Sequence, residues 1–112
     1  MRMFKRISVA EAQDMMSPAD GVDGDVQVVD IRDEDSYARA HIPGAMHLHN
    51  SNIQEFIMEA DPERPVIVCC YHGHMSQSAA AYLAEQGFHK TYSLDGGYEA
   101  WSESGAEESA ES

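Results

Sequence analysis

The most reactive side chains of this sequence stand next to each other: Cys69 and Cys70 are its two cysteines among 112 residues. They end an apolar run, VIVCC, and a polar segment, YHGHM, follows them. Because side chains of a strand alternate between its two faces, the two thiols are expected to point in opposite directions. A disulfide between adjacent strand residues would need a distorted backbone. The pair therefore predicts one structural cysteine and one reactive cysteine.

Cys70 is the candidate nucleophile, because it is the last residue of the predicted strand and the loop after it leads into a helix that starts near Ser76. Ligands of open α/β sheets bind at the carboxyl ends of strands. Loop N–H groups and a helix N-terminus stabilise negative charge there, so the pKa of the Cys70 thiol should be lowered. Gly73 permits the backbone conformation of a tight loop. Cys69 is expected to pack in the core as a small hydrophobic residue.

Other chemistries for this loop find less support. A zinc site built on Cys70, His72 and His74 lacks a second Cys/His cluster, so no metal is expected. The sequence has no C-x-x-C motif for dithiol redox chemistry. A catalytic Cys–His pair stays open, although the two histidines are more simply interpreted as polar residues at the rim. A cysteine phosphatase needs a cation to hold phosphate, and the loop up to Ser76 contains no Arg or Lys.

Alternating strands and helices are predicted to position this loop. Ser8 and Glu11 match a helix-capping box, and Gly87 stands where a glycine commonly ends a helix. The apolar patterns predict strands at 3–7, 26–31, 46–48, 66–70 and 90–94, and helices at 9–16, 33–40, 50–60, 76–86 and within 95–101. This alternation predicts an α/β fold with a mostly parallel central sheet of about five strands and helices on both faces.

Composition limits the remaining possibilities. We expect one domain, residues 1–102, and a disordered acidic tail, residues 103–112, which lacks apolar anchors. The net charge of −13 argues against binding to nucleic acid or to anionic membranes. No apolar run reaches membrane-spanning length, and the N-terminal segment MRMFKRIS does not resemble a secretory signal. Two cysteines make no disulfide scaffold, so a cytoplasmic location is expected.

Three ordered motifs resemble the rhodanese family. The segment VVDIRDEDSYARAHIPGAMHL is similar to the D-x-R motif of the family, followed by an aromatic residue and a G-H-I-x-G-A motif, with Ala40 in place of the first glycine. CYHGHMS resembles the six-residue active-site loop of the single-domain thiosulfate sulfurtransferases in the family. LDGGYEAW is similar to the D-G-G-x-x-x-W ending. The resemblance covers about residues 8–101.

The resemblance implies an activity and a set of site residues. Sulfur would pass from thiosulfate to cyanide or to a thiol acceptor such as thioredoxin, through a persulfide on Cys70 and without a metal or organic cofactor. Asp30 and Arg32 would support the site. The substrate would be held by the backbone amides of Tyr71, His72, Gly73, His74, Met75 and Ser76. The residues that frame the site in turns and packing would be His41, Gly44, Asp95, Gly96, Gly97 and Trp101. Two alternatives remain: a persulfide relay fed by a protein donor, and a non-catalytic rhodanese-like binding module.

Overall fold

Strands and helices alternate along the chain as predicted. The computed structural model describes residues 4–17 and 26–110. Its strands are β1 (Lys5–Ile7), β2 (Gln27–Asp30), β3 (Met46–His47), β4 (Val66–Cys69) and β5 (Thr91–Leu94). Its helices are α1 (Val9–Met16), α2 (Glu34–Arg39), α3 (Ile53–Glu59), α4 (Met75–Glu85) and α5 (Gly97–Glu103). The strands form one parallel sheet in the order β1-β5-β4-β2-β3, which confirms the predicted α/β fold.

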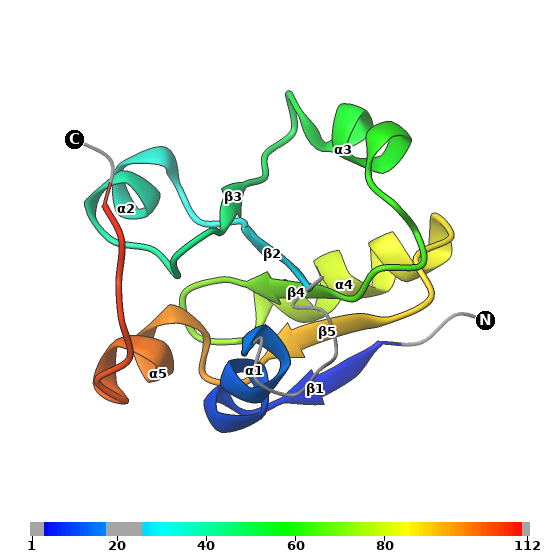
Figure 1. Cartoon of the computed structure of the whole chain (residues 1–112). Coiled ribbons are helices and arrows are strands. Elements are labelled where there is room, and N and C mark those ends of the chain that lie inside the picture. Colours follow the sequence, from blue (N-terminus) through cyan, green and yellow to red (C-terminus); the bar gives the residue numbers. More distant parts are fainter. Residues whose placement is uncertain (1–3, 18–25, 111–112) are drawn as a thin grey trace.

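Helices cover both faces of this sheet (Figure 1). One core cluster joins the sheet to α1 and α5, and the other joins it to α3 and α4. Alternate side chains of β4 enter the two clusters: Ile67 and Cys69 the first, Val66 and Val68 the second. All four are fully buried. The central strand is therefore covered on both faces, which is why its sequence is apolar throughout.

Local signals place the helix ends that were predicted. The Ser8 hydroxyl accepts the Glu11 N–H at 3.1 Å, and the Ser8 N–H donates to the Glu11 carboxylate at 2.8 Å. This reciprocal pair is the expected capping box at the start of α1. Gly87, with φ of +111°, follows the end of α4 in a conformation that favours glycine.

Several element bounds differ by a few residues from the prediction. β4 ends at Cys69 rather than Cys70, because the Cys70 carbonyl accepts the N–H of Tyr98 instead of a strand partner. α3 begins at Ile53, since the Asn52 side chain hydrogen-bonds to the backbone of His47 and His49 and holds residues 50–52 in a turn. Met3 and residues 18–25 of the predicted loop lie outside the described residues.

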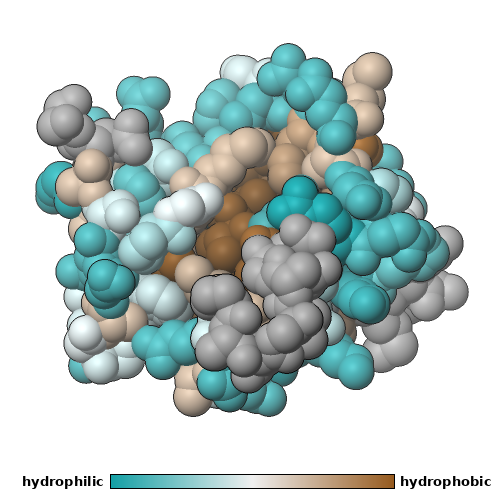
Figure 2. All heavy atoms as spheres, in the orientation of Figure 1, coloured by the Kyte–Doolittle hydropathy of each residue, from teal (hydrophilic) through white to brown (hydrophobic). Residues whose placement is uncertain are grey.

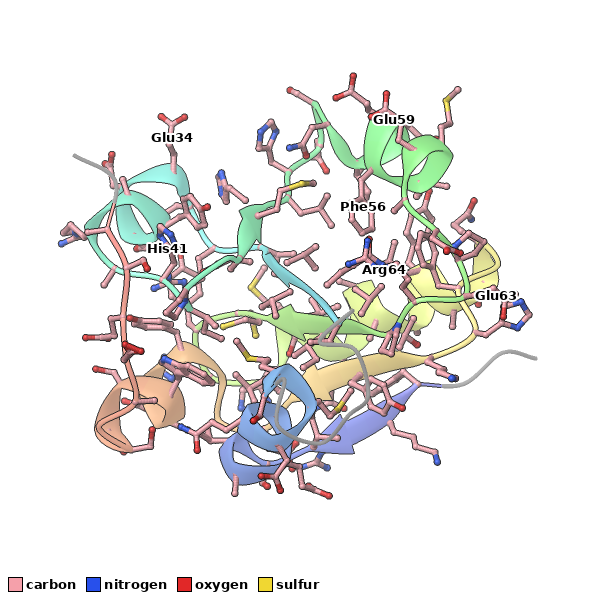
Figure 3. The ribbon with its side chains drawn as sticks, in the orientation of Figure 1. Glu34, His41, Phe56, Glu59, Glu63 and Arg64 are labelled. Atoms are coloured by element: carbon pink, nitrogen blue, oxygen red, sulfur yellow. The ribbon has the colours of Figure 1, made fainter. Side chains whose placement is uncertain are left out.

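Residues of the acidic tail make contacts with the domain. The N–H and carbonyl groups of Ser109 pair with those of His41 at 2.8 Å (Figure 3 labels His41). The Trp101 indole donates to the Glu107 carbonyl at 2.8 Å, and the Tyr98 hydroxyl donates to the Glu108 carboxylate. These partners are a backbone and two aromatic side chains of the domain, so the composition of the tail does not reveal them.

None of the described helices combines the length and the apolar character that crossing a membrane requires.

Candidate active site

Cys70 lies at the carboxyl edge of the sheet, directly after β4. β4 pairs with both β2 and β5 and is the middle strand of the sheet, so Cys70 lies at the middle of this edge. Residues 70–76, here called the cradle loop, run from Cys70 into the first turn of α4. The Cys70 side chain is 2% exposed, and its sulfur is therefore surrounded almost entirely by protein.

Backbone N–H groups of the cradle loop converge on this sulfur. The N–H groups of Gly73 and Ser76 each donate to the Cys70 Sγ at 3.2 Å. Gly73 has φ of +91°, and a Cβ at that position would lie 2.7 Å from the Gly96 nitrogen. A glycine is therefore needed for the loop to close around the sulfur.

The cradle loop lowers the pKa of the Cys70 thiol. Burial alone would raise this pKa. The Ser76 hydroxyl and the N–H groups of Ser76, Gly73 and His72 outweigh that effect, and the pKa falls below the ordinary value for cysteine. Hydrogen-bond donors that face a thiolate stabilise it against protonation. The site therefore favours the nucleophilic thiolate without an Arg or Lys in the loop.

Backbone hydrogen bonds from α5 fix the orientation of the cradle loop. The Cys70 carbonyl accepts the Tyr98 N–H at 2.7 Å, and the Tyr71 carbonyl accepts the Glu99 N–H at 3.2 Å. Gly97 permits this close approach: its φ is +59°, and a Cβ there would lie 2.5 Å from the Cys70 oxygen. Because these carbonyls are held by α5, the loop is left with its N–H groups turned toward the sulfur.

Side chains of the cradle loop are directed to partners other than the sulfur. The Tyr71 hydroxyl donates to the Asp33 carboxylate, and with Ser36 it holds the pKa of Asp33 well below its ordinary value. The His72 Nδ1 lies 3.2 Å from the Glu99 carboxylate. His74 and Met75 are exposed. The geometry therefore brings His72 to Glu99 and does not form a His72–Cys70 pair.

Cys69 has the opposite environment. Its side chain is fully buried in the core cluster beneath α1 and α5, and its thiol donates to the Cys70 carbonyl at 3.6 Å. Burial raises the pKa of the Cys69 thiol, and the nearby Asp30 charge raises it further. The neighbouring thiols thus differ because one faces N–H groups and the other faces apolar side chains.

Asp30 and Arg32 form a buried ion pair next to the site. The Arg32 Nη2 and the Asp30 Oδ2 are 2.8 Å apart, and Nη2 also donates to the Ala40 carbonyl at 2.6 Å. Burial disfavours the charged guanidinium, but the hydrogen bonds and the charge of Asp30 raise the pKa of Arg32. The guanidinium lies 4.1 Å from the centre of the Tyr98 ring. The pair therefore supports Tyr98, whose N–H holds the Cys70 carbonyl.

The framing residues occupy turns and packing positions. His41 pairs with the tail, Trp101 is buried, and Gly44, Gly96 and Gly97 have positive φ. The Asp95 carboxylate accepts a hydrogen bond from Arg6 at 2.8 Å on the surface.

Ser93 is a site residue that the sequence analysis missed. Its hydroxyl oxygen is 2.7 Å from that of Ser76, and both side chains are fully buried. A serine inside an otherwise buried strand is the signal that could have identified it. Its partner could not be read from the sequence, because it depends on the register that pairs Ser93 with Val68 of β4.

Across the described ranges, 4–17 and 26–110, no three His, Cys, Asp or Glu side chains are grouped in a way that could hold a metal ion.

Among the hollows on the surface of the described residues, two bear on where a reacting molecule could bind. One, of about 360 Å³, borders the cradle loop at Met75 and is lined mainly by apolar residues, among them Leu48, Ile53 and Ala79. The other, of about 370 Å³, has no lining residue from the cradle loop. Figure 2 shows a brown apolar patch on the face that contains it. Phe56 of α3 and Arg64 border this second hollow (Figure 3). The first hollow therefore adjoins the cradle loop that contains Cys70.

Comparisons with known proteins agree with this fold. The chain matches the family model described as a rhodanese-like domain over residues 8–104. It is 55% identical over 101 residues to a thiosulfate sulfurtransferase GlpE of Ectopseudomonas mendocina, covering 90% of this chain and 87% of that protein. It is 49% identical over 106 residues to a Shewanella oneidensis protein of the same name, and the match covers 95% of this chain and 100% of that protein. The solved structure of a rhodanese-related protein from Thermoplasma volcanium superposes with a TM-score of 0.77 at 20% identity. The superposition covers 96% of this chain and 100% of that protein.

Proposed function

This chain belongs to the rhodanese-like domain family, and from that premise we propose that it is a thiosulfate sulfurtransferase that works through a persulfide on Cys70. Relatives about half identical to it over most of their length are named for this activity. The observation that carries the proposal is the Cys70 sulfur, which accepts two backbone N–H groups at 3.2 Å. Such donors favour a thiolate and also an anionic sulfur product.

The first half-reaction loads sulfur onto Cys70. The thiolate attacks the outer sulfur of thiosulfate, and a new S–S bond forms. The S–S bond of thiosulfate breaks, and its electron pair leaves with sulfite. Total charge is conserved, since a thiolate and a dianion become a persulfide anion and a dianion. The preformed N–H groups of Gly73 and Ser76 hold the negative charge at the sulfur without reorganising.

The second half-reaction unloads the persulfide. Cyanide attacks the outer sulfur, thiocyanate leaves, and the Cys70 thiolate is restored. A dithiol acceptor acts in two steps: one thiolate takes the outer sulfur, and its second thiol then displaces hydrosulfide as the acceptor becomes a disulfide. Each turnover therefore returns the enzyme to its starting state with two-step transfer kinetics.

We propose a protein dithiol such as thioredoxin as the natural acceptor. Support comes from the apolar hollow of about 360 Å³ beside the loop and from Met75, whose side chain is 58% exposed at its border. An apolar surface does not strengthen the binding of cyanide, whereas a protein acceptor would bury that surface in its interface. Ile53→Glu should lower kcat/KM for reduced thioredoxin about tenfold and leave cyanide turnover unchanged. Equal effects on both acceptors would contradict this assignment.

A reducing compartment such as the cytoplasm suits this chemistry. The nucleophile must remain a free thiol between turnovers, and reducing compartments maintain that state. Both cysteines are free in the structure, and Cys69 is sealed in the core. We therefore propose the cytoplasm as the place where the enzyme works.

Mass spectrometry of peptides after incubation with thiosulfate tests the proposed function. We expect the added mass of one sulfur atom on Cys70 and none on Cys69, in the wild type and in Cys69→Ala. Cys70→Ser should take up no sulfur and have no sulfurtransferase activity. An intact, folded wild type that gains no sulfur would point instead to a relay fed by a protein donor or to a binding module.

A further inference from the structure

Two buried serine hydroxyls lie next to each other, and one of them belongs to a residue that binds the Cys70 sulfur. Ser76, in the first turn of α4, donates its N–H to the sulfur at 3.2 Å. The Ser93 hydroxyl, from β5, lies 2.7 Å from the Ser76 hydroxyl, and both side chains are fully buried. Ser93 therefore stands one hydrogen bond away from the reactive centre.

The direction of the hydrogen bond between these hydroxyls decides what Ser76 can do. If Ser76 donates to Ser93, no acceptor among the described residues receives the Ser93 proton. If Ser93 donates to Ser76, the Ser76 proton is free to point at the anionic sulfur. Only the second arrangement uses both protons, and buried hydroxyl groups rarely leave a proton unpaired. The negative charge of the sulfur favours the same direction, since hydrogen bonds to charged groups are the stronger ones.

We propose that Ser93 is a positioning residue that fixes the Ser76 hydroxyl as a donor to the Cys70 sulfur. Ser93 acts through Ser76 and does not touch substrate. The same arrangement serves thiolate and persulfide, because both carry negative charge at this end of the side chain. In agreement, the Ser76 hydroxyl is among the groups that lower the pKa of the Cys70 thiol.

The test measures thiol reactivity, which requires no sulfur transfer. The proposal rests on the proposed role of Cys70, but alkylation by iodoacetamide reports the thiolate even if thiosulfate is not the substrate. Ser93→Ala should slow alkylation of Cys70 at neutral pH about fivefold and move the midpoint of its pH profile upward. kcat/KM for thiosulfate should fall by a similar factor.

Thr91→Val provides the matched control. Thr91 lies two residues earlier in the same strand and is 3% exposed. Its buried hydroxyl oxygen has no hydrogen-bond partner among the described residues. Removing that hydroxyl should leave the alkylation profile unchanged. A control that slows alkylation as much as Ser93→Ala would show a general effect of altering β5, and the proposal would be wrong.

The double variant separates positioning from mere packing. If Ser93 acts through Ser76, Ser93→Ala should cause no further loss in a Ser76→Ala background. An undiminished loss in that background would overturn the proposal. Cys70 that alkylates as described but never gains sulfur from thiosulfate would refute the proposed function and leave the positioning role intact.

Discussion

At the scale of single residues, the contrast between Cys69 and Cys70 arises from one step along a strand. Alternation turns the first thiol into the core beneath α1 and α5, and its pKa is raised there by burial. The second thiol meets the N–H groups of Gly73 and Ser76, and its pKa is lowered. Identical side chains therefore acquire opposite pKa shifts, one as a packing group and the other as the proposed nucleophile.

This contrast predicts a pH profile. The thiolate is the reactive form of Cys70, and the pKa of this thiol is lowered. As the pH is decreased, kcat/KM for thiosulfate should therefore begin to fall only below the midpoint of an ordinary thiol. The activity is fully present above that lowered pKa and is lost below it. The profile of kcat/KM and the pH dependence of alkylation at Cys70 should share one midpoint. A shared midpoint at or above that of a free cysteine would contradict the assignment.

Local signals select Cys70 as a candidate, whereas the partners of Ser93 and Tyr98 have no local signal in the sequence. Cys70 follows an apolar strand and precedes a glycine-containing loop, and both are local signals. Ser93 acquires its role from the strand register, and Tyr98 acquires its role from where α5 docks. Contacts between elements far apart in the chain are not encoded in the pattern of either element alone.

At the scale of elements, α5 is as much a part of the site as the cradle loop. Its first amides hold the carbonyls of Cys70 and Tyr71, and Gly97 allows the helix to approach. The D-G-G sequence before this helix therefore has a physical purpose. Two consecutive glycines with positive φ, Gly96 and Gly97, turn the chain from β5 into contact with the loop.

Gly97→Ala tests this contact. The new methyl group would lie 2.5 Å from the Cys70 oxygen, so the loop or the helix must move. We expect kcat/KM to fall about tenfold to a hundredfold, together with a loss of about 1–3 kcal/mol in stability.

Gly105→Ala is the control for backbone strain alone. Its φ is +79°, and a Cβ there meets nothing within 4 Å. It should reduce the free energy of unfolding by about 1 kcal/mol and leave kcat/KM unchanged. Comparable losses of activity in both variants would mean that general destabilisation, rather than the α5 contact, is responsible.

The elements themselves were predictable because each carries its own periodicity. The capping box of α1, the apolar run of β4 and the glycine after α4 all give local signals. The order β1-β5-β4-β2-β3 has no such local signal, since it depends on how helices pack after the strands pair. The contacts of the tail lack a local signal for a related reason: its partners, among them Trp101 and Tyr98, belong to the domain.

At the scale of the whole molecule, charge affects how substrate arrives. Thiosulfate is a dianion and the chain carries −13. Charged side chains that contact the cradle loop include the carboxylates of Asp33 and Glu99, while Arg32 is paired with Asp30 and buried. Screening should therefore weaken repulsion. Moderate salt should raise kcat/KM for thiosulfate or leave it unchanged, and a steep fall across a salt titration would contradict this.

The tail contributes to the stability of the whole domain. Removing residues 104–112 deletes the carbonyl that pairs with the Trp101 indole, the Tyr98 partner Glu108, and the Ser109 pairing with His41. We expect the free energy of unfolding in urea to fall by about 2–3 kcal/mol. A chain that lacks only residues 111–112 keeps these contacts and serves as control. Equal urea midpoints for the two truncations would show that the tail contacts add nothing.

The ribosome delivers Cys70 well before Gly97 and Tyr98, the residues whose helix holds the loop in place. Until that helix docks, the Cys70 carbonyl lacks its partner, the loop amides are not held around the sulfur, and the thiol has the reactivity of any free cysteine. The lowered pKa of Cys70 therefore depends on a helix that follows it in the chain, and reactivity above that of a free cysteine reports that α5 is in place.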